Sequence, residues 1–193
     1  EFVVVPLTTP LVSEKLIGHW RFDEGQGLEA YDSTGFSPVG QISSGATWVD
    51  GMGGQFGTAL KFDGSDFAYV DVGDFRIEGA SSFSVWVYKE NLGNWQRVFD
   101  FGNGAGNHNL FLANRGTTNE ARWSIRRGTS NPSYLDVQDF WTLNEWQHVV
   151  ATVDDNGLMK LYRNGEMREA ILGDQPQSVT RTRQYIGKSN WGN

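Results

Sequence analysis

The sequence predicts an all-β protein, an antiparallel sandwich of two sheets. Aromatic residues make up 13% of its 193 residues and glycine occupies 24 positions. Large sheet-forming side chains separated by turn formers are typical of β architecture. About a dozen short apolar segments recur at intervals of roughly ten residues, which is the strand spacing of a sandwich. Strong helix patterns are missing, and a chain of this length can build one core of this kind.

The N-terminal half alternates short apolar segments with acidic, glycine-rich turns. Residues 3–7 are largely β-branched and are followed by Pro10, so we expect residues 1–15 to form an edge strand or a tether. Further strands are predicted at residues 16–22, 59–62 and 68–72. Turns rich in Asp and Gly separate them.

The strand predicted at residues 83–89 is the most hydrophobic of the chain. Phe83 and Val85 alternate with Ser84 and Trp86 along it. Because both of its faces carry large apolar side chains, we expect this strand to lie centrally in its sheet.

Two short apolar segments flank a polar, glycine-rich loop at residues 102–109, which predicts a hairpin. Alternation along the first strand places Phe99 and Phe101 in the core and Asp100 on the opposite face. Phe111 on the return strand shares the face of Asp100. The sequence therefore predicts one buried face and one open face that carries acidic and aromatic groups.

The remaining strands are predicted at residues 121–127, 146–153, 158–163, 166–171 and 184–187. Turn sequences at residues 154–157 and 164–165 are strong hairpin signals. On the first of these strands Trp123 faces the core, while Arg122 and Arg126 extend the open face.

Seven short motifs occur in a particular order along the chain. They are WRFDEG from Trp20, DSTG from Asp32, FDG from Phe62, FSVWV from Phe83, WQHV from Trp146, YRNG from Tyr162 and YIGKSNW from Tyr185. This ordered set resembles the laminin G-like, concanavalin A-like lectin family from residue 16 onward. The resemblance implies a two-sheet antiparallel jelly-roll sandwich of the concanavalin A-like lectin/glucanase type over residues 16–193.

The sequence departs from that family at its end. Members usually continue into a closing strand, and this sequence stops before it. An unclosed sandwich exposes a hydrophobic sheet edge. We hypothesise that the strand lies beyond residue 193, trimmed away or separated by an inserted domain, or that residues 3–7 replace it.

Charge and cysteine content exclude several classes of function. The net charge of −7 disfavours binding to a phosphate backbone, so we do not expect a nucleic-acid partner. No apolar run approaches the ~18 residues of a membrane span, and we expect no membrane insertion. The absence of cysteine excludes disulfides and thiolate metal sites. The resemblance implies a secreted, extracellular or cell-surface location.

Carboxylates in turns at strand ends are the candidate metal ligands. Calcium binds several oxygen ligands, which such glycine-bearing loops can supply. The resemblance implies a structural calcium near a sheet edge, with candidate ligands Glu24, Asp32, Asp63 and Asp66. The alternative interpretation is that these residues are turn caps and solvated acids.

Candidate ligand-binding residues lie on the open face and in the adjoining loop. They are Asp100, Asn103, Asn107, His108, Phe111, Arg122 and Arg126. Sugar rings stack on aromatic faces, while amide, carboxylate and guanidinium groups hydrogen-bond their hydroxyls. The alternative is an ordinary solvated face with Asp–Arg pairs across strands.

The tryptophans divide by their place in the pattern. Trp95, Trp141 and Trp191 lie near loops and are candidates for exposed stacking on a ligand. Trp86, Trp123 and Trp146 lie on predicted strands with apolar neighbours, and we expect them in the core.

No catalytic motif is apparent. Retaining glycoside hydrolysis needs two carboxylates about 5 Å apart, and no strand carries acids at alternating positions. We therefore expect a non-catalytic carbohydrate-binding module of a larger secreted enzyme or bacterial surface adhesin, which binds polysaccharide or cell-surface glycan beside neighbouring domains of its parent protein. The alternatives are a protein–protein adhesion or spacer domain and, less favoured, a glycoside hydrolase or polysaccharide lyase.

Overall fold

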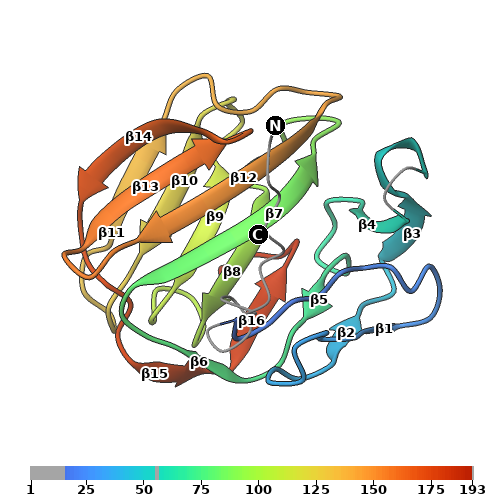
Figure 1. Ribbon diagram of the computed structural model, residues 1–193, viewed down its shortest axis with the longest axis horizontal. Helices are drawn as coiled ribbons and strands as arrows, with labels where there is room; N and C mark the ends of the chain where they lie inside the picture. The colour runs from blue at the N-terminus through green and yellow to red at the C-terminus, as the bar shows by residue number, and fades with distance from the viewer. Residues whose placement is uncertain (1–15, 55–56, 193) are drawn as a thin grey trace, which may run out of the picture.

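The computed structural model describes residues 16–54 and 57–192, which form a β-sandwich (Figure 1). The larger sheet contains, in spatial order, β1 (Glu29–Ala30), β2 (Gly40–Ile42), β5 (Val70–Asp71), β16 (Arg183–Ile186), β8 (Arg97–Gly102), β9 (Leu110–Asn114), β10 (Ala121–Ile125) and β11 (Ser133–Val137). The smaller sheet contains β14 (Glu166–Leu172), β13 (Leu158–Arg163), β12 (Trp146–Val153) and β7 (Ser81–Tyr88). Neighbouring strands are antiparallel throughout both sheets, which confirms the predicted fold class.

Two short strand pairs complete the fold. They are β6 (Phe75–Ile77) with β15 (Val179–Arg181), and β3 (Ala46–Asp50) with β4 (Thr58–Phe62), which is preceded by the 3-10 turn η1 (Gly51–Gly54). The described residues contain no helix long and apolar enough to cross a membrane.

The smaller sheet lies over the β8 to β11 half of the larger sheet, and the β3–β4 hairpin lies beyond its β7 edge (Figure 1). The core fills the space between the sheets. Phe83 of β7 stacks on Phe99 of β8 with ring centroids 5.1 Å apart, and it packs on Trp123 of β10 at 5.4 Å. Aromatic contacts therefore join the two sheets within a core that also contains many aliphatic side chains.

Cross-strand register gives the larger sheet two distinct faces. Side chains at directly opposed positions share a face. One row across the sheet belongs to the core, namely Ile42, Val70, Ile186, Phe99, Leu112, Trp123 and Leu135. The next row points the other way, namely Gln41, Asp71, Tyr185, Asp100, Phe111, Ser124 and Tyr134. The face that carries this second row is called the outer face below.

Most predicted strands from residue 59 onward are present, but two predictions are wrong. Residues 16–22 form no strand, because their only ladder contact in the described residues is one isolated bridge from Trp20 to Asp32; Phe22, with a φ of +57°, then ends the extended backbone. β7 lies at the edge of its sheet among the described residues, not centrally, and its outward side chains Trp86 and Tyr88 are exposed. Residues 3–7, the predicted substitute for a closing strand, lie outside the described residues.

Asp32 organises the turn that precedes β2. Its Oδ1 accepts hydrogen bonds from the amides of His19 (2.6 Å) and Thr34 (3.2 Å). Its Oδ2 accepts from the hydroxyl of Thr34 (2.5 Å) and from the amides of Phe36 (3.1 Å) and Ser37 (2.9 Å). Burial by itself raises the pKa of Asp32, but these hydrogen bonds outweigh it and lower the pKa to about 2.

We therefore predict that Asp32 makes stability depend on pH in acid. The pKa is about 2 in the folded chain and about 3.9 in the unfolded chain, so the contribution of Asp32 is complete above pH ~4 and is lost as the pH falls towards 2. Urea unfolding should show Asp32→Asn to be less stable than the wild type at pH 7, with a difference that shrinks below pH 4. The exposed turn variant Asp155→Asn is the control, and a difference for Asp32→Asn that is constant with pH would contradict the assignment.

Candidate functional site

Aromatic rings and guanidinium groups alternate across the outer face. The guanidinium of Arg122 lies 4.0 Å from the ring centroid of Tyr134 and 5.3 Å from that of Trp95. The guanidinium of Arg97 lies 5.7 Å from the Trp95 ring and 4.3 Å from the Phe111 ring. These cation–π contacts form a continuous row, which we call the arginine–aromatic ladder.

An ion pair on Arg122 holds the ladder in place. Arg122 donates from Nε to Asp136 Oδ1 and from Nη2 to Asp136 Oδ2, both at 2.6 Å, in the bidentate geometry favoured by guanidinium and carboxylate. Tyr134 is nevertheless 46% exposed, and Trp95 is half-buried. The row therefore presents rings to solvent whose positions are already fixed.

The other arginine of the ladder, Arg97, forms a buried ion pair. A β-bulge between Arg97 and Phe99 turns Arg97 onto the outer face, where its Nε donates to Asp100 Oδ2 at 3.2 Å. Asn109 donates to Asp100 Oδ1 at 3.0 Å. The side chains are 7% exposed for Arg97 and 0% for Asp100. Burial raises the pKa of Asp100 above its usual value, although Arg97 and the donors from Asn190 and Asn109 act in the opposite direction.

Residues 188–192 cover this pair and are called the C-terminal segment below. The turn into it is made by Gly187, whose φ is +85° and where a Cβ would come within 2.7 Å of the Phe62 ring. Asn190 donates from its amide to Asp100 Oδ2 (3.1 Å) and from Nδ2 to Asp100 Oδ1 (3.0 Å). Trp191 then packs edge-on against Phe111, with ring centroids 5.8 Å apart.

The structure corrects the predicted open face at two positions. Asp100 and Phe111 do lie on the same outward row, as alternation predicted. Both are buried, however, because the C-terminal segment covers them. Arg122, the third predicted residue of this face, is half-buried within the ladder.

The other predicted ligand-binding residues lie in loops at one end of the larger sheet, where they hold main-chain groups. Asn103 Oδ1 accepts from the amide that follows β15 (2.8 Å), and His108 Nδ1 accepts from the amide of Gly128 (3.0 Å). The amide of Asn103 donates to the carbonyl of Asn107 (2.8 Å), and Arg126 donates to a carbonyl in the next turn. The structure therefore does not bring these four residues together with the ladder.

The predictions for the tryptophans are confirmed in part. Trp123 is fully buried in the core, as predicted. Trp86 is 51% exposed and Trp141 is only 3% exposed, so both of those predictions are wrong. Trp95 and Trp191 lie half-buried on the outer face, beside the arginines of the ladder. The sequence signal for this site was aromatic residues close to arginines, but only the fold places them in one row.

The four predicted metal ligands do not converge. Within residues 16–54 and 57–192, no three His, Asp or Glu side chains lie close enough to share an ion. Both oxygens of Asp32 accept protein hydrogen bonds, and Asp63 Oδ1 accepts from the amide of Ser65 at 2.8 Å. Glu24 Oε1 accepts from the amide of Tyr31, whereas its buried Oε2 has no protein partner.

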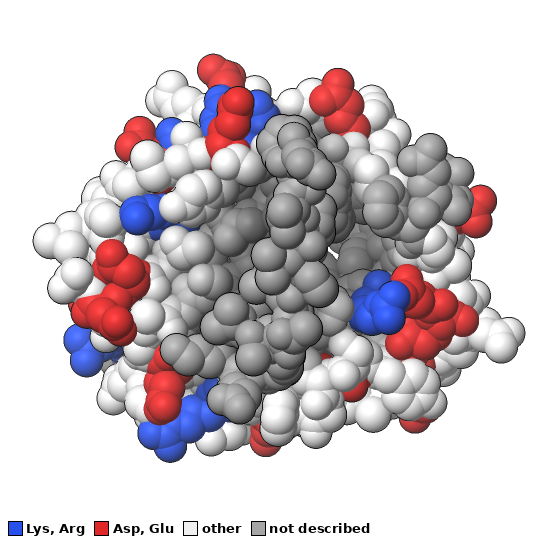
Figure 2. All heavy atoms as spheres, viewed as in Figure 1, with Lys and Arg blue, Asp and Glu red and all other residues white. Residues whose placement is uncertain are grey.

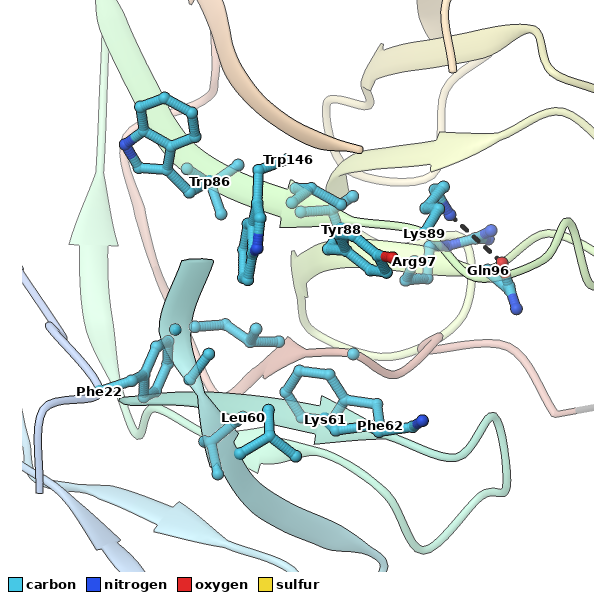
Figure 3. A pocket seen from close by; sticks show the side chains of 18 of the residues that line it. Phe22, Leu60, Lys61, Phe62, Trp86, Tyr88, Lys89, Gln96, Arg97 and Trp146 are labelled. Carbon is cyan, nitrogen blue, oxygen red and sulfur yellow. Dashed lines mark hydrogen bonds between the residues drawn. The ribbon is translucent and has the colours of Figure 1, made fainter. Parts of the chain in front are cut away.

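A cleft of about 1230 Å³ lies between β7 and the β3–β4 hairpin. In the close-up view Trp86, Tyr88 and Trp146 lie on one side of it, and Leu60 and Phe62 lie on the other (Figure 3). Several residues that line the cleft are partly buried and pack against the hydrophobic core. On the face seen in Figure 2, acidic and basic side chains are interspersed, so charge does not mark a binding surface there.

We predict that removing the buried carboxylate loosens the outer face. Asp100→Ala leaves Arg97 buried without its counterion, which should lower the free energy of unfolding by about 3–5 kcal/mol. The amide of Asn190 should also exchange its hydrogen faster, because its acceptor is gone. Asp74→Ala, at an exposed acid, is the control and should stay within about 0.5 kcal/mol of the wild type. Wild-type stability and exchange rates in Asp100→Ala would contradict this account of the site.

Solved structures with a similar fold are binding domains or parts of enzymes. Domain 4 of AbnA, a GH43 extracellular arabinanase from Geobacillus stearothermophilus, solved in complex with arabinotriose, superposes with a TM-score of 0.73 and 24% identity over 92% of this chain and 85% of that one. The binding domain of botulinum neurotoxin serotype D/C gives a TM-score of 0.66 and 15% identity over 92% of this chain and 45% of that one. The binding domain of Paraclostridial Mosquitocidal Protein 1 gives 0.60 and 12% over 92% and 50%. At these identities the likeness shows the fold, and no curated protein matches the sequence.

The family assignment rests on a match to the sequence. Residues 62–193 match a family described as the concanavalin A-like lectin/glucanases superfamily, which is more than half of the chain. The matched region contains the whole smaller sheet, the larger sheet apart from β1 and β2, and the whole arginine–aromatic ladder. The chain belongs to the concanavalin A-like lectin/glucanase superfamily, as its ordered motifs predicted.

Proposed function

We propose that this domain binds carbohydrate on the outer face of its larger sheet and does not cleave it. The observation that carries the proposal is the arginine–aromatic ladder, in which Trp95 and Tyr134 present rings held by Arg122. Sugar rings pack on such aromatic faces. Because the guanidinium of Arg122 is already bound by Asp136, little side-chain freedom is left to lose on binding.

Polar groups beside the ladder suit the hydroxyl groups of a sugar. Arg115 is half-exposed next to the ladder, where it pairs with Glu120 at 2.9 Å and approaches Asp136 at 3.6 Å. Charged donors and acceptors at the edge of an aromatic surface can hydrogen-bond a ligand and orient it while they stay partly exposed to water.

The cleft beside β7 is a weaker candidate for a sugar site. Its walls include side chains such as Val85, Leu60 and Phe62, which pack against the core cluster. β7 is hydrogen-bonded to β12 on one side, and among the described residues no strand pairs with its other side. The exposed rings of Trp86 and Tyr88 also line this cleft, but they pack on His148 and Trp146 and not on arginines that carboxylates hold in place.

The proposed role is to target a larger protein to a polysaccharide or to a cell-surface glycan. The similar solved structures support it, because they include a domain of an extracellular arabinanase in complex with arabinotriose and receptor-binding domains of toxins. We place the domain in a secreted enzyme or a surface adhesin, in an extracellular location, beside neighbouring domains of its parent protein.

The first test removes the two rings of the ladder that reach solvent, that of Tyr134 and that of the half-buried Trp95. A glycan array first identifies which glycans the wild type binds. Trp95→Ala and Tyr134→Ala should each weaken binding to these glycans by about tenfold, because truncating an aromatic anchor costs on the order of 1–2 kcal/mol. Trp86→Ala is the matched control, since it removes an equally large exposed ring from the smaller sheet. Affinities would be measured by titration calorimetry. Loss of binding in Trp86→Ala alone, or no glycan bound by the wild type, would overturn the proposal.

A contact with a neighbouring domain is the second candidate function, and one observation favours it. Trp86 packs on His148 with ring centroids 5.1 Å apart, and Tyr88 packs on Trp146 at 5.6 Å, on the exposed side of the smaller sheet. Exposed aromatic clusters of this kind often lie in protein interfaces. In that case Trp86→Ala should disrupt the association of the parent protein's domains and leave glycan binding unchanged.

Of the four predicted calcium ligands, we propose that Glu24 binds a structural calcium ion, because its Oε2 is buried without a protein partner. Calcium that binds only the folded chain raises the melting temperature by mass action. We predict that millimolar calcium raises the melting temperature of the wild type relative to EDTA, and that Glu24→Gln abolishes the increase. Asp63→Asn is the control, and a melting temperature insensitive to both calcium and EDTA would remove calcium from the proposal.

A further inference from the structure

We infer that the outer face contains a second subsite, which binds the carboxylate of an acidic sugar beside Tyr185 and Lys188. The inference rests on the proposed carbohydrate function and adds the chemical class of the ligand. The proposed subsite lies on the β5–β16 side of the sheet, away from the rings of Trp95 and Tyr134.

The subsite is built on a pair of tyrosines whose rings are in contact. Tyr69 and Tyr185 meet edge to face, with ring centroids 5.4 Å apart. The ammonium of Lys188 lies 4.1 Å from the centroid of the Tyr69 ring and 5.3 Å from that of Tyr185. Because the rings support the lysine side chain, its charge is held at the surface of the sheet.

A hollow of about 280 Å³ adjoins this pair. It is lined by Asp66, Arg183, Tyr185 and the C-terminal segment, which includes Lys188 and Trp191. The hollow is open to solvent and has space for one sugar ring. Trp191 is half-buried at its margin and offers a ring surface on which such a sugar can pack.

The charges of the hollow favour an anion. The arginines of the ladder are already paired, Arg97 with Asp100 and Arg122 with Asp136. The ion pairs formed among the described residues include neither Arg183 nor Lys188. These two cations line the hollow with one acid, Asp66, in a chain whose overall net charge is −7.

A carboxylate attached to a pyranose ring matches this arrangement. It accepts charge-assisted hydrogen bonds from the ammonium of Lys188 and the guanidinium of Arg183, while the ring packs on Trp191. Both an uronic acid within a polysaccharide and a sialic acid at the end of a cell-surface glycan have this chemistry. The experiment below distinguishes these two sources.

The test compares matched acidic and neutral ligands by titration calorimetry. One arm uses 3′-sialyllactose and its methyl ester, and the other uses trigalacturonic acid and its methyl ester. We expect the wild type to bind the acidic member of one arm about tenfold more tightly, as one charge-assisted contact allows. The arm that shows this preference identifies the source of the carboxylate.

Two variants assign the preference to the hollow. Lys188→Gln and Arg183→Gln should each reduce the preference to about twofold or less, because the acidic member loses a charge-assisted contact that the neutral member never makes. Lys160→Gln on β13 removes the same charge from the other sheet and should retain the preference. Melting temperatures confirm that each variant is folded.

The outcomes separate this inference from the proposed function. Equal affinities for acidic and neutral ligands in both arms, or a preference that survives both variants, would overturn the acidic subsite while the carbohydrate function stands. No binding of any glycan in the two arms or on the array would overturn the proposed function and this inference with it.

Discussion

The buried ion pair between Arg97 and Asp100 is the interaction on which the outer face depends. Asp100 accepts hydrogen bonds from Arg97, from Asn109 and from Asn190, a residue that lies 90 positions away in the sequence. A buried pair of this kind gains little net stability, because desolvation offsets the attraction between the charges. Its main effect here is on geometry, since it fixes the C-terminal segment on the sheet and so places Trp191 beside the ladder. Releasing the segment would expose Phe111, against which Trp191 packs.

The two proposed subsites follow from this geometry. The C-terminal segment leaves β16 at Gly187 and crosses the outer face between the tyrosine pair and the ladder, with Lys188 on one side and Trp191 on the other. One segment therefore contributes to both the stacking row and the acidic hollow. Rings and cations are held by contacts that exist before any ligand arrives, so binding needs little further ordering of side chains. A preorganised surface of this kind suits a module whose function is recognition.

Local chemistry explains why much of the fold could be predicted. The Asn164–Gly165 turn has φ values of +53° and +83°, which Asn-Gly sequences adopt readily and which join β13 to β14. Alternation along β8 correctly placed Phe99 in the core and Asp100 on the opposite face. Strands with weak patterns were missed, among them β2 and β11, because their partners stabilise them more than their own residues do. Residues 16–22 were wrongly predicted as a strand, since an apolar pattern does not show whether a neighbouring strand is present to pair with it.

The sequence by itself determined the fold class, the main hairpins, the family and the faces of the long strands, because periods of two residues and turn chemistry are local properties. Only the tertiary structure decided which face is covered. The bulge that turns Arg97 outward, the burial of Asp100 and Phe111, and the exposure of Trp86 all depend on segments far away in the chain. Whether an outward side chain meets water or another segment is set by packing between distant residues, and no local pattern records it.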